Sequence, residues 1–268
     1  MIKPARLLLP ATTLLAMLSA NAYGQSDYYF GKIGKFPIVV ELQRDGNALS
    51  GWYFYRAQGK EIRLDGSIAS DGTFHLNELA DGKKTALFEG TVANGLWHGN
   101  WHKLTGSNPA LPFAFEQAHD DANALDGSYT CSGKRHDSIA GGQYQSDLRW
   151  NLKLAISAGR VRTFVAGQTT RMDDKSEQAC SMGLADLHQQ SSKVGVLLKA
   201  KADTPDEGNP ECSVKVVGDA DTLLVTFGDG SKADDDCRGV GNVMFCSARG
   251  GWANFVLDRH ANTCKALM

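Results

Sequence analysis

The sequence has no closely spaced cysteine pair and no excess of basic charge. All six cysteines of the 268-residue chain lie after residue 130, and the nearest two are Cys237 and Cys246, which are not at Cys-x-x-Cys spacing. Zinc ribbons and fingers need such pairs, so this class of metal protein is excluded. The formal net charge is −2, whereas proteins that bind nucleic acid carry a basic face to replace counterions. We therefore expect no nucleic acid partner.

The sequence also lacks the local motifs of the common enzyme classes. It contains no Gly-x-Ser-x-Gly elbow, no Ser-x-x-Lys, no His-Glu-x-x-His and no Walker loop. Gly228-Asp-Gly230 and Gly239-Val-Gly241 lack the third glycine and the following helix of a nucleotide-binding loop, and hairpin turns are the better interpretation. We therefore expect a protein that is not an enzyme, with no catalytic residue and no cofactor.

The chain does begin like an exported protein. Its first residues combine a positive start, an apolar run and small residues before a cleavage point: Lys3 and Arg6, residues 7–18, and Ala20-Asn21-Ala22. We expect cleavage before Tyr23, with cleavage after Gly24 as the alternative. The apolar run is shorter than the roughly 20 residues of a membrane-spanning helix, so we expect no membrane anchor. The expected location is the periplasm or the medium.

Six cysteines in an exported chain predict three disulfides, formed in an oxidising compartment. Many pairings are possible in principle. A bond between the first and the last cysteine would tie the first strand of the second half to its end. The pairs that we favour are Cys131–Cys264, Cys180–Cys212 and Cys237–Cys246.

Between residues 28 and 117, short β-prone runs alternate with turn residues at a spacing of roughly ten residues, and no helical period is present. The turns include Asp71-Gly72, Asp81-Gly82-Lys83 and Ala93-Asn94-Gly95. The runs between turns are FPIVVELQ, LSGWYFYRA, KEIRLDGSI, TFHLNEL, KTALFEGTV and LWHGNWHKL. This pattern predicts an antiparallel meander of about seven or eight strands that curls into a barrel or half-barrel.

The aromatic run in LSGWYFYRA offers candidate binding residues. Side chains alternate between the two faces of a strand, so Tyr53 and Tyr55 share one face while Trp52 and Phe54 share the other. One pair is expected in the core, and the other could meet solvent or a ligand. We take Tyr53 and Tyr55 as candidate binding residues, with cross-strand packing on both faces as the alternative.

The histidines in LWHGNWHKL have the spacing of a helical metal pair. On a strand, however, His98 and His102 would lie about 13 Å apart and could not share a zinc ion. We therefore expect no metal site here. The opposite face of this strand carries Trp97 and Trp101, which could stack on sugar rings.

The second half is predicted to be a disulfide-bonded β-sandwich or small barrel. DLRWNLKLAIS places Trp150 and Leu152 on one face and Asn151 and Lys153 on the other, and a turn at Ser157-Ala158-Gly159 leads into RVRTFVAG. GVLLKAKA, CSVKVVG and TLLVTFGD continue the β pattern, and MGLADLHQQ is the one candidate for a helical turn. The predicted organisation is residues 1–22 signal peptide, 23–118 β-meander domain, 119–126 linker and 127–268 disulfide-rich β domain.

The first half resembles a β-meander module that is common in exported Gram-negative bacterial proteins of unknown function. The likeness covers residues 28–117 and implies a fold but no catalytic residue. The recurring elements are an aromatic strand and three glycine-containing strands, which read here as Gly51-Trp-Tyr53-Phe-Tyr55, Leu64-Asp-Gly66, Phe88-Glu-Gly90 and Gly99-Asn-Trp101.

The second half resembles, in its layout, the periplasmic inhibitors of c-type lysozyme. The likeness rests on Tyr129-Thr-Cys131 near its start and on Cys264 near its end, because the first and last cysteines of those small barrels can close the chain. That family inserts a loop with a Ser-Gly-x-x-Tyr motif into the lysozyme cleft. Here Ser132-Gly133 is followed by His136 at the tyrosine position, so the inhibitory residues are not carried over.

These observations favour an exported, non-catalytic binding or inhibitory protein of the cell envelope. Its partner would be a protein or an envelope polysaccharide, and the oligomeric state is left open. Candidate contacts are the region 135–144 and Arg249 with Trp252, whose composition suits an interface anchor. In the alternative interpretation Trp252 is buried and Arg249 is solvated. The alternative functions are an envelope-polymer hydrolase and a purely structural envelope protein.

Overall fold

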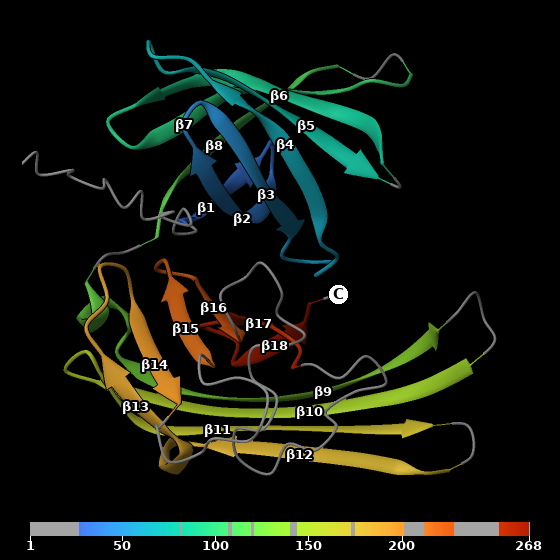
Figure 1. Cartoon of the computed structure of the whole chain (residues 1–268), viewed down its shortest axis with the longest axis vertical. Coiled ribbons are helices and arrows are strands. Elements are labelled where there is room, and N and C mark those ends of the chain that lie inside the picture. The colour runs from blue at the N-terminus through green and yellow to red at the C-terminus, as the bar shows by residue number, and fades with distance from the viewer. Residues whose placement is uncertain are drawn as a thin grey trace, which may run out of the picture.

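The computed structural model describes residues 27–80, 82–106, 109–118, 121–139, 144–172, 175–200, 212–227 and 252–267. These residues form β-strands with two short 3₁₀ helices. The strands build a closed barrel, then a four-stranded and a six-stranded sheet (Figure 1). The predicted all-β class, with a barrel followed by a disulfide-bonded pair of sheets, is confirmed. The predicted signal peptide lies outside the described residues.

The barrel consists of eight antiparallel strands, each paired with the next along the chain. The last strand pairs back with the first, with Gly31 opposite Phe115, and this pairing closes the barrel. The strands are β1 (Asp27–Ile33), β2 (Phe36–Asp45), β3 (Ala48–Tyr55), β4 (Ile62–Ile68), β5 (Thr73–Ala80), β6 (Lys83–Ala93), β7 (Leu96–Lys103) and β8 (Leu111–Gln117). The predicted meander is therefore a complete up-and-down barrel.

Glycines of the predicted turns and motifs have distinct structural roles. At the turn between β6 and β7, Asn94 and Gly95 have φ angles of 52° and 80°, the left-handed values of a two-residue hairpin loop. Within β3, a Cβ added to Gly51 would lie 1.9 Å from the carbonyl oxygen of Glu41. Gly66 in β4 meets the same obstacle, 1.9 Å from the carbonyl oxygen of His75. These motif glycines let neighbouring strands approach closely, as the tight barrel requires.

The second half is a sandwich of two antiparallel sheets. The four-stranded sheet contains β9 (Gly127–Ile139), β10 (Tyr144–Ser157), β11 (Arg160–Met172) and β12 (Glu177–Gly183). The six-stranded sheet contains β13 (Leu187–Gln190), β14 (Val196–Ala200), β15 (Ser213–Gly218), β16 (Thr222–Phe227), β17 (Phe255–Asp258) and β18 (Thr263–Ala266). The helix η3 (Leu184–Asp186) falls in the segment predicted to hold a helical turn. The two sheets share one apolar core, with Leu152 and Phe164 on one side and Val214 and Val225 on the other.

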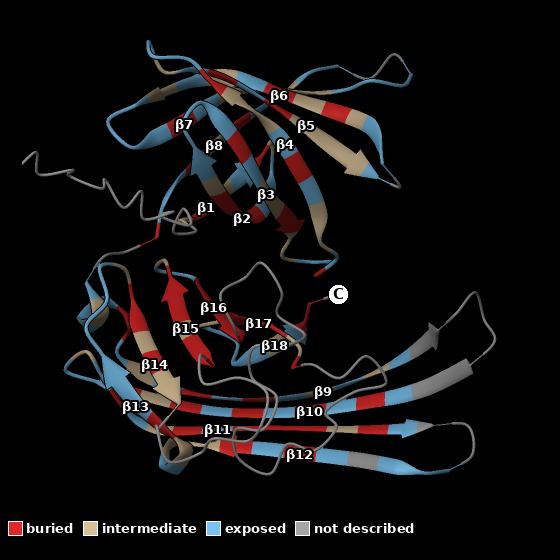
Figure 2. Ribbon diagram, viewed as in Figure 1, coloured by how far each residue is buried: buried red, intermediate tan, exposed pale blue. Residues whose placement is uncertain are grey.

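The barrel packs on the outer face of the six-stranded sheet, so that sheet is the middle of three layers (Figure 1). Tyr28, Phe30 and Phe54 of the barrel wall form one apolar cluster with Leu224 and Val256 of the sheet. As a result, every residue of β16 is buried, which Figure 2 shows as continuous red. A strand covered on both faces is mostly apolar, and in TLLVTF the two polar residues, Thr222 and Thr226, are buried with the rest.

Polar contacts also join the barrel to the sandwich. Arg56, just after β3, forms a 3.2 Å ion pair with Asp258 at the end of β17. The Lys265 ammonium donates a hydrogen bond to the carbonyl oxygen of Ala57. Together with the apolar cluster, these contacts hold the barrel against the sandwich.

The expected linker at residues 119–126 falls between β8 and β9. It contains the 3₁₀ helix η1 (Ala122–Leu125), which Asp121 caps by accepting a hydrogen bond from the Asn123 N–H. Leu125 is fully buried in the sandwich core, and Arg259 donates to the Ala124 carbonyl oxygen at 2.9 Å. The end of this segment is therefore packed against the sandwich. In the part of the chain that the structure describes, no helix is long and apolar enough to cross a membrane.

The disulfide between Cys131 and Cys264 links β9 to β18, the facing edges of the two sheets, as predicted. Cys180 and Cys212 are also disulfide-bonded and buried. Among the described residues, the structure shows no bond between Cys180 and Cys212, in contrast to the predicted pairing. Cys237–Cys246 lies outside the described residues.

Candidate functional site

The predicted binding residues Tyr53 and Tyr55 point into the barrel. Tyr53 is 0% exposed, and its ring meets Phe88 edge-on with centroids 5.4 Å apart. Tyr55 is half-buried nearer the end of the barrel, against the exposed ring of Phe36 at 6.1 Å. Tyr53 is thus a core residue, which matches the packing alternative.

A carboxylate lies beside the two tyrosines. Glu78 accepts hydrogen bonds from the Tyr53 hydroxyl at 2.6 Å, the Thr85 hydroxyl at 2.7 Å and the Trp101 indole N–H at 3.3 Å. A register shift between β5 and β6 immediately follows Glu78 in the chain. Burial raises the pKa of Tyr53, and the Glu78 carboxylate raises it further, so the phenol stays a donor. This cluster ties four strands together, and three donors already occupy its carboxylate.

The remaining aromatic candidates are also internal. Trp97 is buried and stacks on Phe115 with ring centroids 5.7 Å apart, so it presents no face to a sugar. Trp252 is 3% exposed and stacks on Phe227 at 5.1 Å, which agrees with the alternative that it is buried. Arg249 lies outside the described residues.

The histidines of β7 lie on the outside of the barrel, as expected for a strand. His98 contacts the Thr91 hydroxyl at 3.4 Å, and His102 lies 3.8 Å from the Glu89 carboxylate. The two histidines therefore have different partners, Thr91 for His98 and Glu89 for His102. Over the described residues, no group of three or more His, Cys, Asp or Glu side chains is placed to hold a metal ion.

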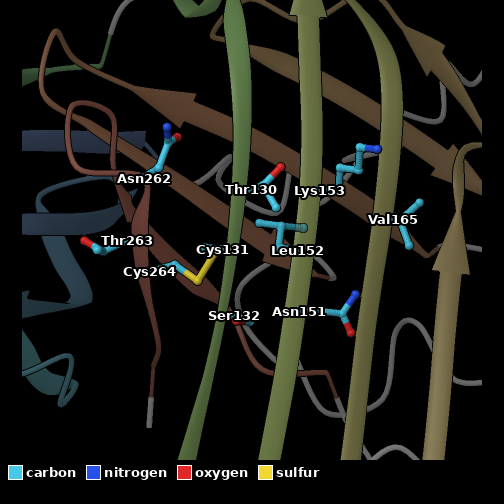
Figure 3. A pocket seen from close by; sticks show the side chains of 10 residues that line it. All are labelled: Thr130, Cys131, Ser132, Asn151, Leu152, Lys153, Val165, Asn262, Thr263 and Cys264. Carbon is cyan, nitrogen blue, oxygen red and sulfur yellow. A yellow bond between two sulfur atoms is a disulfide. The ribbon is translucent and has the colours of Figure 1, made fainter.

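The structure places an open cavity of about 630 Å³ where the edge of the four-stranded sheet meets the turn before β18. Its lining comes from β9, β10 and β11 and from the residues around the Cys131–Cys264 bond, as Figure 3 shows. The lining residues are Thr130, Cys131, Ser132, Asn151, Leu152, Lys153, Val165, Asn262, Thr263 and Cys264.

Strand register brings the polar lining residues together. Ser132 lies directly opposite Asn151, and Thr130 lies directly opposite Lys153, across the β9–β10 pair. All four are exposed, because they alternate with the buried residues of the sandwich core. Asn262 reaches the same cavity from the turn between β17 and β18, where its φ of 51° is left-handed.

The described lining of this cavity combines hydrogen-bonding side chains with one positive charge, that of Lys153. Hydroxyl and amide side chains can both donate and accept, and the Lys153 ammonium can donate up to three hydrogen bonds. Among the described residues, the lining contains no carboxylate and no imidazole, and Cys131 and Cys264 are bonded to each other. The described lining residues therefore offer a ligand one charged donor together with neutral hydroxyl and amide groups.

No family model, curated protein or solved structure matches this chain. The cavity itself was missed by reasoning from the sequence. Alternation in DLRWNLKLAIS did place Asn151 and Lys153 on the outer face. Asn262 lies beside β9 only because the edges of the two sheets meet, and no local sequence pattern indicates that meeting.

Proposed function

We propose that this chain is an exported, non-catalytic binding protein of the cell envelope, with the cavity beside the Cys131–Cys264 bond as its ligand site. The observation that carries the proposal is the cavity lining, which joins hydroxyl and amide side chains to one ammonium group. Ligand sites are typically concave, with a few polar groups that fix orientation. A rigid, disulfide-bonded platform suits such a site, because little ordering is needed on binding.

Export is supported by the sequence and by the cysteine chemistry. The first residues have the pattern of a signal peptide, and the described cysteines are all disulfide-bonded. Disulfides persist in oxidising compartments such as the periplasm or the medium. An envelope polysaccharide or an envelope protein is then the natural class of partner.

The hydrolase alternative has less support from the arrangement of side chains. Most glycoside hydrolases use two carboxyl groups that flank the scissile bond. Glu78 is the carboxylate of the aromatic cluster, and its hydrogen-bonding capacity is used by Tyr53, Thr85 and Trp101. The cavity lining, as far as the structure describes it, contributes no carboxylate.

The test uses the mature protein and purified peptidoglycan sacculi. We expect the protein to sediment with sacculi without clearing them. Thr130→Trp, which fills the cavity from its exposed rim, should abolish this binding. Thr91→Trp, at an exposed position on the barrel, is the matched control and should bind like wild type. Equal melting temperatures would show that both variants fold.

Two results would overturn the proposal. Clearing of sacculi by the wild-type protein would support the hydrolase. Absence of sedimentation, together with no protection of sacculi against added c-type lysozyme, would support a purely structural protein. Protection that Thr130→Trp removes would instead identify the binding as inhibitory.

A further inference from the structure

We infer that the solvent-facing side of the four-stranded sheet, continuous with the cavity, binds an acidic polysaccharide. This inference rests on the proposed function, because it names the class of ligand for the same site. The surface in question is formed by the exposed side chains of β9 and β10 around the cavity. We call it the basic face, and its members are Thr130, Ser132, Lys134, Arg149, Asn151 and Lys153.

Two positive side chains stand directly opposite each other on this face. Lys134 of β9 is in register with Arg149 of β10, and both are exposed. Like charges at directly opposite positions of an antiparallel pair repel and destabilise the sheet. An anion bound between the two side chains would relieve this repulsion, so the pair has the arrangement of an anion site.

The positive charge of the basic face is only partly offset by nearby acids. Lys134, Arg149 and Lys153 form no ion pair with any described residue. Asp147, two residues before Arg149 on the same face of β10, is close enough to interact electrostatically with Arg149, but its hydrogen bond goes to another side chain. Asp147 accepts from His136 at 2.9 Å, and Glu177 lies 3.9 Å from Arg171.

The spacing of these groups suits an extended chain of anionic units. Arg149 and Lys153 are four residues apart on one strand, which separates them by about 13 Å along one face. Asn151 lies between them on the same face, with Ser132 opposite it. A polymer lying along β10 could therefore place acidic groups at both cations and sugar hydroxyls at the amide and hydroxyl between them.

The composition of the face favours a polysaccharide over an acidic protein. Protein interfaces concentrate their binding energy in aromatic anchors and well-packed apolar pockets. No aromatic residue is among the described lining residues of the cavity, and the exposed apolar side chain among them is Val165, at 40%. Hydroxyl, amide and cationic groups match the hydroxyl and carboxylate groups of an acidic sugar chain.

Fluorescence anisotropy with labelled polygalacturonate tests the inference on the full mature protein. We expect wild type to bind it, with affinity that falls as salt rises, and not to bind neutral dextran. The double variant Lys134→Ala/Arg149→Ala should lose about tenfold or more in affinity. It should also lower the slope of log affinity against log salt by about one for each cation removed. Lys134→Arg should retain binding because it keeps the charge.

The matched control removes two cations from the barrel instead. Lys83 and Lys84 are exposed on β6, so Lys83→Ala/Lys84→Ala makes the same change in net charge. Equal affinity of both double variants would overturn the inference, because general charge would then explain the binding. Equal binding of polyglutamate and polygalacturonate by wild type would also overturn it, in favour of an acidic protein.

The same set of proteins separates this inference from the proposed function. If wild type sediments with sacculi and Thr130→Trp does not, the binding function stands. Failure to bind polygalacturonate under those conditions would then overturn the ligand class alone. Failure in both assays would overturn both proposals.

Discussion

The hydroxyl of Tyr53 donates a 2.6 Å hydrogen bond to the carboxylate of Glu78 inside one end of the barrel. Tyr53 comes from β3, Glu78 from β5, and the other donors, Thr85 and Trp101, from β6 and β7. Hydrogen bonds to a charged group contribute about 1.5–3 kcal/mol each, and the three bonds here are partly buried. This cluster therefore fixes the mutual positions of four strands.

Neutralising the carboxylate should weaken the barrel. We expect Glu78→Gln to lower the free energy of unfolding by about 1–3 kcal/mol, because the amide weakens the bonds from Tyr53 and Trp101. Urea unfolding followed by tryptophan fluorescence measures this. Glu89→Gln changes an exposed carboxylate on the same barrel and should stay within about 0.5 kcal/mol of wild type. An equal loss of unfolding free energy in the two variants would show that the Glu78 cluster stabilises the barrel no more than an exposed carboxylate does.

Stability should fall at alkaline pH because of a buried phenol. Burial raises the pKa of Tyr29 to about 12 from its ordinary value of 10.0, and the Asp27 carboxylate adds to the shift. Between these values the unfolded chain loses a proton that the folded protein keeps, so the free energy of unfolding decreases as pH rises. Below the ordinary pKa of 10.0, Tyr29 is protonated in both the folded and the unfolded state, so it gives stability no dependence on pH.

Urea midpoints measured between about pH 9 and 12 should show this decrease above about pH 10. Tyr29→Phe removes the titrating group while keeping the ring against Trp97, and should flatten the upper part of the profile. A variant profile as steep as that of wild type would assign the alkaline loss to other groups.

The interface between barrel and sandwich depends on an aromatic side chain. Phe54 is fully buried in the cluster that contains Leu224 and Val256. We expect Phe54→Ala to lower the free energy of unfolding by about 3–5 kcal/mol, because a large cavity opens between the two layers. Phe36→Ala, at a ring 47% exposed on the same barrel, is the control and should change stability far less. Similar losses in the two variants would contradict the packed interface.

The Cys131–Cys264 bond closes a long stretch of chain. A non-reduced proteolytic digest should yield the peptides of Cys131 and Cys264 joined, which mass spectrometry detects. The residues are 133 positions apart, so Cys131→Ala/Cys264→Ala should lower stability by about 2–5 kcal/mol through the freer unfolded chain. Recovery of either cysteine in a different linked peptide would refute this pairing.

Local patterns carried much of the fold of the first half. Turn residues such as Asn94 and Gly95 mark hairpins because their left-handed φ angles suit few other residues. Alternation correctly put Tyr53 and Tyr55 on one face of β3. Which face was the inside could not be read locally, because Trp52 and Phe54 are equally apolar. They turned out to face the sandwich.

The candidate site was much less predictable. Trp252 is a residue type that often anchors protein interfaces, yet it stacks on Phe227 in the core. Composition cannot separate these cases, because the same aromatic ring stabilises a core or an interface by the same burial of apolar surface. The cavity was missed because its lining residues are ordinary polar side chains of strands and turns.

Strand alternation and turn chemistry were enough to predict an all-β chain, with a meander of seven or eight strands followed by a disulfide-bonded β-sandwich or small barrel. The bond from Cys131 to Cys264 was the favoured pairing among many that six cysteines allow. These features follow from local backbone preferences and from the tendency of apolar side chains to share one face. The closing of β8 on β1, the burial of β16 on both faces and the meeting of Asn262 with β9 depended on packing between distant segments. Such contacts are fixed by which apolar faces cover one another, and that choice is made only when the whole chain folds.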